Sequence, residues 1–394
     1  MPEVSSTVDC LVIGGGLLGA ALSYYVARAG ASVLLLEKDQ LNQHASGRNA
    51  GSLHFQLEYR MIEHGIEEAR KAAEAMPLHL DAAKEWFSFK ERLEEDLGVV
   101  QQGGMMLAET AEQARLLEEK TLLEQSWGLE THMLTKGDIQ ARAPYLSRSI
   151  LAAAFCPIEG KADPRRATLA FARLAERNGA IVRSGAAVVG LRRQSSTWRA
   201  LLTDGVEVVA RQVAITAGAW SGRVAAMAGI SLPVSPIGLM MTATVRTQPL
   251  VKHLIQHAGR RLSLKQTPEG TVLIGGGWPA RLRQYDGVVD IDHPPDILPE
   301  SIAGNMAAAA AVVPSLREVP VLRIWSGSTS LVPDQLPLLG PVPRRTGLFI
   351  ATGGSAFTLG PTYARILAGQ MLDAPIAFDV SRYDPRRFAS LSNA

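Results

Sequence analysis

Cysteine is scarce in this sequence of 394 residues, which contains only Cys10 and Cys156. Two cysteines form at most one disulfide, and no C-x-x-C pair is present to hold zinc or an iron–sulfur cluster. We therefore expect no metal bound by this chain, and a reducing cytoplasm fits its cysteine content best.

An excess of charge of one sign is also lacking. Forty Lys and Arg residues against 38 Asp and Glu leave a net charge of +2 without a long basic run, so we expect no nucleic-acid partner. The most apolar segment, residues 306–313, stops at Pro314 and is shorter than the roughly 18 residues that a membrane span needs. Residues 1–9 lack the basic and apolar regions of a secretory signal. We expect a cytoplasmic protein without a membrane span.

The composition that remains is that of an ordinary globular protein, with 47% hydrophobic and 20% charged residues. The length predicts two or three domains. No internal repeat or low-complexity tract interrupts the chain.

A strand, a glycine turn and a helix follow one another near the start of the sequence. The strand is predicted over residues 8–13 and the helix over residues 20–28. Gly14 permits a tight turn, Gly16 lets the backbone approach a pyrophosphate, and Gly19 lets the helix pack against the strand. The helix N-terminus adds N–H donors and a partial positive charge. The turn therefore predicts a dinucleotide site made of Gly14, Gly16, Leu17, Leu18 and Gly19.

A second apolar strand over residues 32–36 ends at Glu37. An acidic residue about 20 positions after the glycine turn can accept hydrogen bonds from the ribose hydroxyls of a dinucleotide. A solvated acid at a strand end is the alternative, but the preceding strand, turn and helix favour the first interpretation. Glu37 and its neighbour Lys38 are predicted to contact the cofactor.

The next segment distinguishes FAD from NAD. It is rich in small residues and hydrogen-bonding groups, and it resembles the second phosphate and flavin contact of FAD enzymes, whereas NAD enzymes usually continue into another helix and strand. FAD is therefore the expected cofactor. The predicted contacts are Ser46, Gly47, Arg48, Asn49, Ala50 and Gly51.

With this loop the sequence resembles the family of FAD-dependent amine and D-amino-acid oxidoreductases, to which glycine oxidase, the sarcosine oxidases and hydrogen cyanide synthase belong. The resemblance implies an α/β fold: a Rossmann-like FAD-binding domain of the D-amino-acid oxidase type, and an α+β substrate domain on an antiparallel sheet. We expect the FAD domain to be discontinuous, over residues 1–60, 150–225 and 330–394. The substrate domain is expected over residues 60–150 and 226–330.

Later segments carry the same resemblance. Residues 162–166 lead into a helix that ends near residue 179, and the following strands place Val188 near the adenine. The segment 213–221 resembles the strand and turn beside the cofactor, with Ala217 and Gly218 in the turn, and residues 261–266 and 271–276 resemble a hairpin of the substrate domain.

The last part of the sequence resembles the flavin cap of the family. By this resemblance, Gly353 and Gly354 present backbone amides to the pyrimidine edge of the flavin. Thr358 and Leu359 begin the last helix beneath it, and the positive end of that helix points at N1 and O2.

The family implies oxidation of a carbon–nitrogen bond by hydride transfer to flavin N5, which gives an imine that hydrolyses. Thr329 stands where many relatives clamp the substrate carboxylate with an arginine, and Leu273 stands where sarcosine-oxidase-like relatives have a lysine that assists reaction with oxygen. A dehydrogenase is therefore favoured, and an oxygen-using glycine, sarcosine or D-amino-acid oxidase is the alternative. A third possibility is a flavin-binding subunit without catalysis.

Residues 46–51 and 357–361 look most like the catalytic subunits of opine oxidases and D-hydroxyproline dehydrogenases. These act on secondary amines with companion subunits that carry further redox centres, iron–sulfur clusters or a second flavin. The resemblance therefore implies a small amine or amino acid as substrate and such subunits as partners.

His54 and Gln56 follow the flavin loop and are candidates for orienting the substrate. A histidine satisfied by hydrogen bonds in the core is the equally weighted alternative for His54. Lys265 could pair with a second substrate carboxylate or lie in solvent, Met241 is expected in the pocket wall, and covalent attachment of flavin to His44 is not expected.

Overall fold

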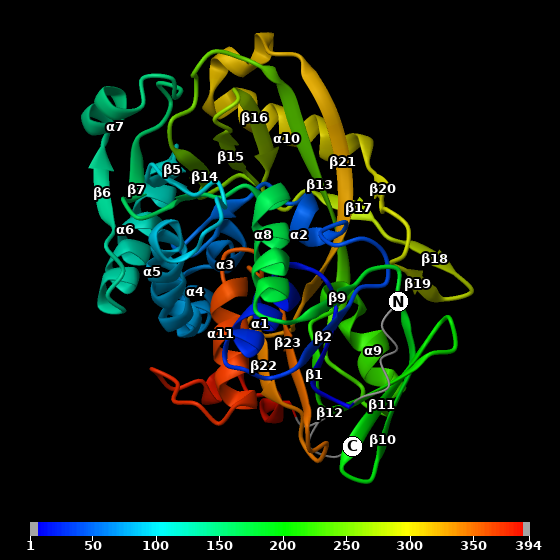
Figure 1. Ribbon diagram of the computed structural model, residues 1–394. Helices are drawn as coiled ribbons and strands as arrows, with labels where there is room; N and C mark the ends of the chain where they lie inside the picture. Colours follow the sequence, from blue (N-terminus) through cyan, green and yellow to red (C-terminus); the bar gives the residue numbers. More distant parts are fainter. Residues whose placement is uncertain (1–6, 389–394) are drawn as a thin grey trace.

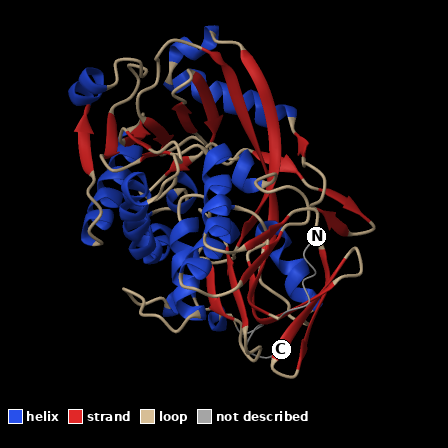
Figure 2. Cartoon of the chain, viewed as in Figure 1, coloured by secondary structure: helices blue, strands red, loops and turns tan. Residues whose placement is uncertain are grey.

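A computed structural model describes residues 7–388 of the chain. Its strands form two large sheets, one in the lower half of Figure 1 and one in the upper half, with helices packed around both (Figures 1 and 2). The expected class is confirmed, because the first sheet has a parallel core and the second is mostly antiparallel.

The first sheet has a parallel core in the order β9-β2-β1-β12-β23. These strands are β1 (Val8–Ile13), β2 (Val33–Leu36), β9 (Ile181–Arg183), β12 (Glu207–Ile215) and β23 (Leu348–Thr352). The hairpin of β10 (Val188–Gln194) and β11 (Thr197–Leu202) pairs with β12, and β22 (Leu338–Pro341) pairs with β23, all antiparallel. Strand β1 therefore has its two partners roughly 20 and 200 residues away along the chain, which makes the sheet a product of long-range pairing.

Helices cover both faces of this sheet, as a parallel sheet requires. The helices α1 (Leu17–Arg28), α8 (Pro164–Arg177) and α11 (Gly360–Met371) share a hydrophobic core with Val12 and Leu35. The short helix α9 (Ser221–Met227) packs with Leu11 and Leu34, whose side chains point to the opposite face. Alternate residues of the strands are therefore buried on opposite sides, which explains why β1 and β2 are apolar along almost their whole length.

The second sheet runs in the order β20-β17-β13-β16-β15-β14-β5-β7-β6, with β21 also paired to β13. Its strands are β5 (Gly104–Ala108), β6 (His132–Thr135), β7 (Ala152–Cys156), β13 (Ser235–Arg246), β14 (Leu254–His257), β15 (Ser263–Gln266), β16 (Thr271–Gly275), β17 (Pro279–Arg281), β20 (Asp296–Ile297) and β21 (Val321–Leu331). Only β14 and β5 pair in parallel. The predicted hairpin of residues 261–266 and 271–276 forms as β15 and β16.

The two faces of the second sheet have different neighbours. Helix α10 (Pro299–Val312) packs with Leu264, Val272 and Ile274 in one hydrophobic core. Lys265 alternates with Leu264 on β15, so its side chain points to the other face. There it borders the same space as the loop of residues 46–51.

A group of helices flanks both sheets on the left of Figure 1. It consists of α3 (Tyr59–Ile62), α4 (Ile66–Ala72), the 3-10 turn η1 (Ala73–Ala75), α5 (Met76–Arg92), α6 (Ala111–Ser126) and α7 (Lys136–Arg142). The remaining elements are α2 (Ala45–Arg48), the small sheet of β3 (Ser52–Leu53), β8 (Gly160–Lys161) and β4 (Val100–Gln101), the hairpin of β18 (Arg283–Tyr285) and β19 (Val288–Asp290), and the turns η2 (Gly218–Trp220), η3 (Pro314–Glu318), η4 (Ser381–Tyr383) and η5 (Pro385–Arg387).

The division into two domains stays a prediction, but the strand pairing bears on one of its limits. β7 begins at Ala152 and pairs with β5 in the second sheet. The limit expected at residue 150 is therefore better drawn after this strand. Within residues 7–388, no helix is both long enough and apolar enough to cross a membrane, and Cys10 and Cys156 are buried as free thiols.

Candidate functional site

The glycine turn between β1 and α1 is packed so closely that its glycines have no room for side chains. Gly14 has a φ of +117°, and a Cβ there would lie 2.7 Å from the carbonyl oxygen of Thr216. At Gly19 a Cβ would lie 1.9 Å from the carbonyl oxygen of Gly14. Gly16 is partly exposed, and a Cβ there would lie 2.9 Å from the Ser46 hydroxyl. Backbone N–H groups at the start of α1 thus remain open to a ligand, an arrangement that binds phosphate.

Glu37 closes on this turn instead of extending into solvent. Its Oε2 accepts a hydrogen bond of 2.7 Å from the backbone N–H of Gly15, and its Oε1 accepts one of 2.9 Å from the N–H of Asp39. The side chain is buried, so a carboxylate is held at the end of β2 next to the glycine turn. This geometry fits an acceptor for ribose hydroxyls and fits a solvated strand end poorly.

A cavity of about 410 Å³ lies against the glycine turn, and we call it the nucleotide cavity. Its walls come from the N-terminal, central and C-terminal parts of the chain. The predicted cofactor residues in its wall are Gly14, Gly16, Leu18, Glu37, Lys38, Ser46, Val188, Ala217 and Gly218. Residues of β21 and of the segment after β23 complete it, namely Ser328, Thr329, Ser330, Ala351, Thr352 and Ala356. The structure therefore brings together the segments that were expected to share a cofactor.

One end of the nucleotide cavity is aromatic. The rings of His44 and Trp220 lie 4.5 Å apart, and Lys38 Nζ lies 4.7 Å from the centre of the Trp220 ring. Asp292 accepts a hydrogen bond of 2.7 Å from Trp220 Nε1 and fixes the indole. Since Val188 lines the same cavity, this end can receive a flat base by stacking.

The loop of residues 46–51 separates the nucleotide cavity from a second, larger one. The Ser46 hydroxyl accepts a hydrogen bond of 2.9 Å from the backbone N–H of Leu17 and lines the nucleotide cavity. Gly47, Asn49 and Ala50 line the other cavity, which is described below.

The same loop is tied to β21. Arg48 donates from Nη1 to the carbonyl oxygen of Ser326 at 3.2 Å, and its own carbonyl accepts from Trp325 Nε1 at 2.7 Å. Asn49 Oδ1 accepts from the N–H of Gly51, which has a φ of +73°. The loop therefore has a fixed shape in which both faces border a cavity.

The C-terminal glycine loop is held from outside by an ion pair. Arg60 donates to the Ser355 hydroxyl at 2.9 Å, and that hydroxyl donates to Glu58 Oε1 at 2.6 Å. Burial alone would raise the pKa of Glu58, but the Arg60 guanidinium and the Ser355 hydrogen bond lower the pKa to about 2. The carboxylate therefore stays charged at all ordinary pH values and holds Ser355 beside Gly354.

The four residues predicted to cap the flavin lie next to the nucleotide cavity without lining it. Gly353 has a φ of +127°, and the carbonyl of Gly354 accepts a hydrogen bond of 3.1 Å from the Tyr363 hydroxyl. Thr358 donates to the Ser52 carbonyl at 3.2 Å, and Leu359 immediately precedes α11. Their contact with the flavin stays a prediction.

His54 has protein partners on both ring nitrogens. Its Nδ1 lies 2.9 Å from Gln256 Nε2, and its Nε2 lies 3.0 Å from the Ser263 hydroxyl. Burial, the largest effect, lowers the pKa of His54 to about 4, so the ring is neutral at pH 7. With Gln256 as donor, Nδ1 accepts and Nε2–H donates to Ser263, whose own hydrogen remains available to another acceptor.

Gln56 lies in a buried polar network and lines neither cavity. Its Nε2 donates to Glu159 Oε2 at 3.0 Å and its Oε1 accepts from Lys120 Nζ at 3.0 Å. Both ends of the amide are therefore engaged in the core, and of the two residues predicted to orient the substrate only His54 keeps a place beside the inner face of the second sheet.

Thr329 lines the nucleotide cavity between Ser328 and Ser330. It lies on β21 opposite Ile237, and Met241 lies opposite Trp325 farther along the same strand pair. The Met241 sulfur is the atom nearest to Gly275, which fits its predicted place in a wall. Hydroxyls thus take the position where an arginine was expected.

Among residues 7–388, one group of three side chains has donors close enough for a metal ion, namely Glu37, Asp39 and His44, within 4.8 Å of one another. Each already has a protein partner, because Glu37 accepts from Gly15 and His44 Nε2 lies 2.7 Å from Asp39 Oδ2. The group therefore serves to shape the wall of the nucleotide cavity, and we propose no metal there.

Four further residues line the nucleotide cavity that were not predicted from the sequence, namely Thr216, Trp220, Arg223 and Ser330. Trp220 offered a signal, because a large aromatic directly after the small-residue turn of Ala217 and Gly218 is unusual for a tightly packed strand end. The other three carry no local signal, since their place depends on pairing between distant strands.

Comparison with known proteins finds relatives that span nearly the whole chain. The model of a family described as FAD dependent oxidoreductase (DAO) matches residues 9–370. The chain is 29% identical over 391 residues to glycine oxidase of Geobacillus kaustophilus (strain HTA426), which covers 96% of this chain and 97% of that protein. It is 27% identical over 397 residues to an opine oxidase subunit of Rhizobium meliloti, with 97% and 98% covered. The crystal structure of the Geobacillus kaustophilus glycine oxidase matches with a TM-score of 0.85 at 25% identity, covering 98% of this chain and 100% of that one.

Proposed function

This chain belongs to the DAO family of FAD-dependent oxidoreductases, and we propose that it oxidises the carbon–nitrogen bond of an amine or amino acid. The observation that carries the proposal is the nucleotide cavity, which the glycine turn, Glu37 and the end of β21 border together. FAD fits the residues present, because the turn has no space for side chains and Glu37 is fixed as an acceptor beside it.

The chemistry that bound FAD supplies is two-electron acceptance: the carbon next to the amine nitrogen loses a hydride to the flavin, and the resulting imine is hydrolysed by water. Gly14, Gly16 and Glu37 would hold the phosphates and a ribose. His54, kept neutral by burial, orients the Ser263 hydroxyl on the inner face of the second sheet. Met241 on the same face excludes water from the space above the loop of residues 46–51.

A secondary amine is the favoured substrate. The opine oxidase subunit is a relative along its whole length, and the name of that enzyme gives opines as its substrates, which are secondary amines that carry carboxylates. Thr329 offers a hydroxyl where an arginine clamp was expected, so a simple glycine oxidase receives less support. The runner-up is a glycine, sarcosine or D-amino-acid oxidase, which the 29% identity to glycine oxidase favours.

The electron acceptor is a separate part of the proposal. Leu273 occupies the position where a lysine would assist reaction with oxygen, which favours a dehydrogenase that passes electrons to companion redox subunits. Lys265 lies directly opposite Leu273 on β15, so this face of the sheet still carries a buried ammonium. Oxygen consumption therefore has to be measured alongside substrate oxidation.

We expect the purified protein to be yellow and to bleach under anaerobic conditions when a secondary-amine amino acid is added. The screen should include opines, D-proline derivatives, sarcosine and glycine, with flavin absorbance as the readout. After exposure to air, we expect turnover with a dye acceptor to exceed oxygen consumption by about tenfold or more, a ratio corresponding to roughly 1.4 kcal/mol of barrier.

Two results would contradict this expectation in different ways. Rapid oxygen consumption with the same substrates would identify an oxidase. Bleaching by none of the amines, in protein that holds FAD stoichiometrically, would support a subunit that binds flavin without catalysis.

We further expect His54→Leu to raise the KM about tenfold while kcat changes less. The substitution removes the donor that holds the Ser263 hydroxyl and leaves Gln256 without its acceptor, and a lost hydrogen bond of this kind costs roughly 1–2 kcal/mol. Since the pKa of His54 is about 4, the wild-type KM should show no titration by His54 between about pH 5 and 8. The exposed His64 provides the control, His64→Leu, and an unchanged KM in His54→Leu would remove His54 from the site.

A further inference from the structure

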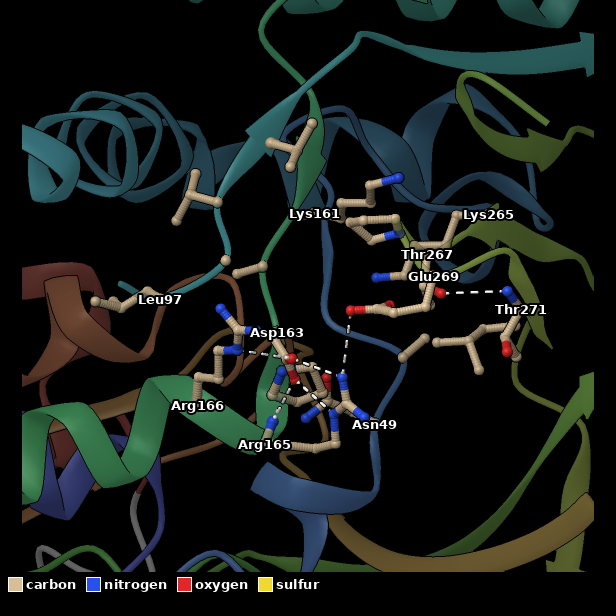
Figure 3. Close-up of a pocket in the computed structure, with 18 of the residues that line it drawn as sticks. Asn49, Leu97, Lys161, Asp163, Arg165, Arg166, Lys265, Thr267, Glu269 and Thr271 are labelled. Atoms are coloured by element: carbon tan, nitrogen blue, oxygen red, sulfur yellow. Dashed lines mark hydrogen bonds and ion pairs between the residues drawn. The ribbon is translucent and has the colours of Figure 1, made fainter. Parts of the chain in front are cut away.

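The larger cavity, on the other side of the loop of residues 46–51, has a volume of about 900 Å³, and we call it the basic cavity (Figure 3). Its walls come from that loop, the end of α5, the segment around β8, the start of α8, and the inner face of the second sheet. In Figure 3, Lys161, Lys265 and Glu269 lie on one side of the space, and Asp163, Arg165 and Arg166 on another.

Every acidic side chain in the wall of the basic cavity already has an arginine partner. Arg165 pairs with Asp163 at 2.8 Å and lies 4.0 Å from Glu269. Asp96 pairs with Arg166 at 2.6 Å. Glu94 lies 3.8 Å from Arg177, and Glu95 pairs with Arg173 at 2.6 Å. The acids of this wall are therefore neutralised before any ligand is present.

Several cations in the same wall have no acidic partner among residues 7–388. Lys265 is 3% exposed, and its Nζ is buried without a hydrogen-bond partner in that part of the chain. Lys161 Nζ is bound to the backbone carbonyl of Gln266 and, among the described residues, to no carboxylate. Arg246 and Arg323 form no ion pair with any described residue, and Arg323 lies over the Trp325 ring at 4.9 Å. The wall thus has an uncompensated positive charge, with its most buried member at Lys265.

A buried ammonium without a partner is costly, and proteins keep one where something else pairs with it. Lys265 lies next to Ser263 on the same face of β15, two positions along, and its charge acts on His54. The basic cavity therefore lies beside the proposed site of oxidation, and only the flavin loop separates it from the nucleotide cavity.

We propose that the basic cavity binds the carboxylate or phosphate group of an organic anion, with Lys265 as its central ligand and Lys161 as the second. The anion has two conceivable sources. A carboxylate would come from the amine substrate, as the second acidic group of a dicarboxylic secondary amine. A phosphate would belong to a separate phosphorylated ligand that occupies the cavity beside the flavin. The site itself does not depend on the proposed function.

The ionisation of Lys265 supports this assignment. Burial, the largest effect, lowers its pKa well below the usual value, and the nearby Lys161 lowers it further, while Asp163 acts in the opposite direction. An anion beside Nζ would stabilise the charged form and raise the pKa again. Binding should therefore take up a proton and weaken as the pH rises, the sign expected when the free lysine is less protonated than the bound one.

The test is a titration of the FAD-loaded protein with inorganic phosphate and, separately, with succinate, followed by calorimetry and by the thermal midpoint. Lys265→Met keeps the length of the side chain and removes the charge, and Lys265→Arg restores a cation. Lys90→Met is the matched control, since Lys90 lines the same cavity but is exposed. Flavin absorbance of each variant verifies that the protein is folded and loaded.

We expect at least one of the two anions to bind the wild type, at least tenfold more weakly to Lys265→Met, and unchanged to Lys90→Met. Tighter binding of phosphate than of succinate identifies a phosphorylated ligand, and the reverse identifies a carboxylate. Binding of neither anion, or equal binding by wild type and Lys265→Met, overturns the proposal. Flavin bleaching by amines is measured independently, so a failure here does not count against the oxidation of amines, nor the reverse.

Discussion

Gly16→Val should yield a folded but colourless protein. Gly16 has φ −79° and ψ −178°, extended backbone that any residue adopts, so the substitution brings little backbone strain. Its Cβ would nevertheless lie 2.9 Å from the Ser46 hydroxyl, and the branched side chain would occupy the part of the nucleotide cavity where we place the phosphates. Two lost phosphate contacts at roughly 1.5–3 kcal/mol each correspond to a loss of affinity of about a hundredfold or more.

The measurement is the ratio of FAD to protein after purification, followed by titration of the apoprotein with FAD. Gly222→Ala is the control, because a Cβ there meets no described atom within 4 Å. Circular dichroism and the thermal midpoint of the apoprotein verify the fold. Stoichiometric FAD in Gly16→Val, with wild-type affinity, would refute the placement of the phosphates.

Lys120→Met should destabilise the protein by about 3–5 kcal/mol, the usual cost of removing one partner of a buried ion pair. Lys120 and Glu124 are both fully buried, and Lys120 Nζ lies 2.8 Å from Glu124 Oε1. Burial raises the pKa of Glu124 even with Lys120 present, and burial raises the pKa of Glu159 to about 7 against the hydrogen bonds from Gln56 that lower it. Removal of the ammonium leaves two buried carboxyl groups without a cation.

The same network predicts how this loss depends on pH. A carboxyl group whose folded pKa is raised holds its proton more tightly in the folded state, so the stability that it contributes is present at low pH and is lost as the pH rises toward the folded pKa. For Glu159 this window extends from about 4.5 to about 7. Lys120→Met raises both pKa values further, so its destabilisation should be smaller at pH 5 than at pH 8.

Chemical denaturation at both pH values measures the effect, and Lys84→Met is the matched control, since Lys84 is exposed on α5. A change of less than about 1 kcal/mol in Lys120→Met at pH 8 would be that of a surface substitution. Such a result would mean that water reaches the network.

The sequence predicted those parts of the fold that local patterns determine. The strand over residues 8–13 forms as β1 within the predicted limits, and the hairpin of β15 and β16 forms around Gly270. Glycines that need a positive φ or a close backbone approach are visible in a sequence, because few other residues can replace them. The nucleotide turn was therefore predictable residue by residue as far as Gly14 and Gly19.

The environment of single polar side chains was not predictable in the same way. Gln56 follows the flavin loop in sequence, but Glu159 and Lys120, from segments about 100 and 60 residues away, turn its amide into the core. Lys265 stands in a strand of mixed residues that is typical of a solvated lysine, and it is buried because α10 covers one face of the sheet and the flavin loop lies across the cavity on the other. Both outcomes depend on which distant elements pack together, and a single sequence does not encode that locally.

The order in which the first sheet is completed has a consequence for synthesis of the protein. β1 leaves the ribosome early, yet its partner β12 begins at Glu207, and β23 and α11, which complete the sheet and its core, end only at Met371. A nascent chain interrupted between these points presents the apolar edge of β12 and the uncovered side of α1 to chaperones or to other chains. Capture of FAD should therefore be a late, post-translational event, and its rate should report completion of the fold.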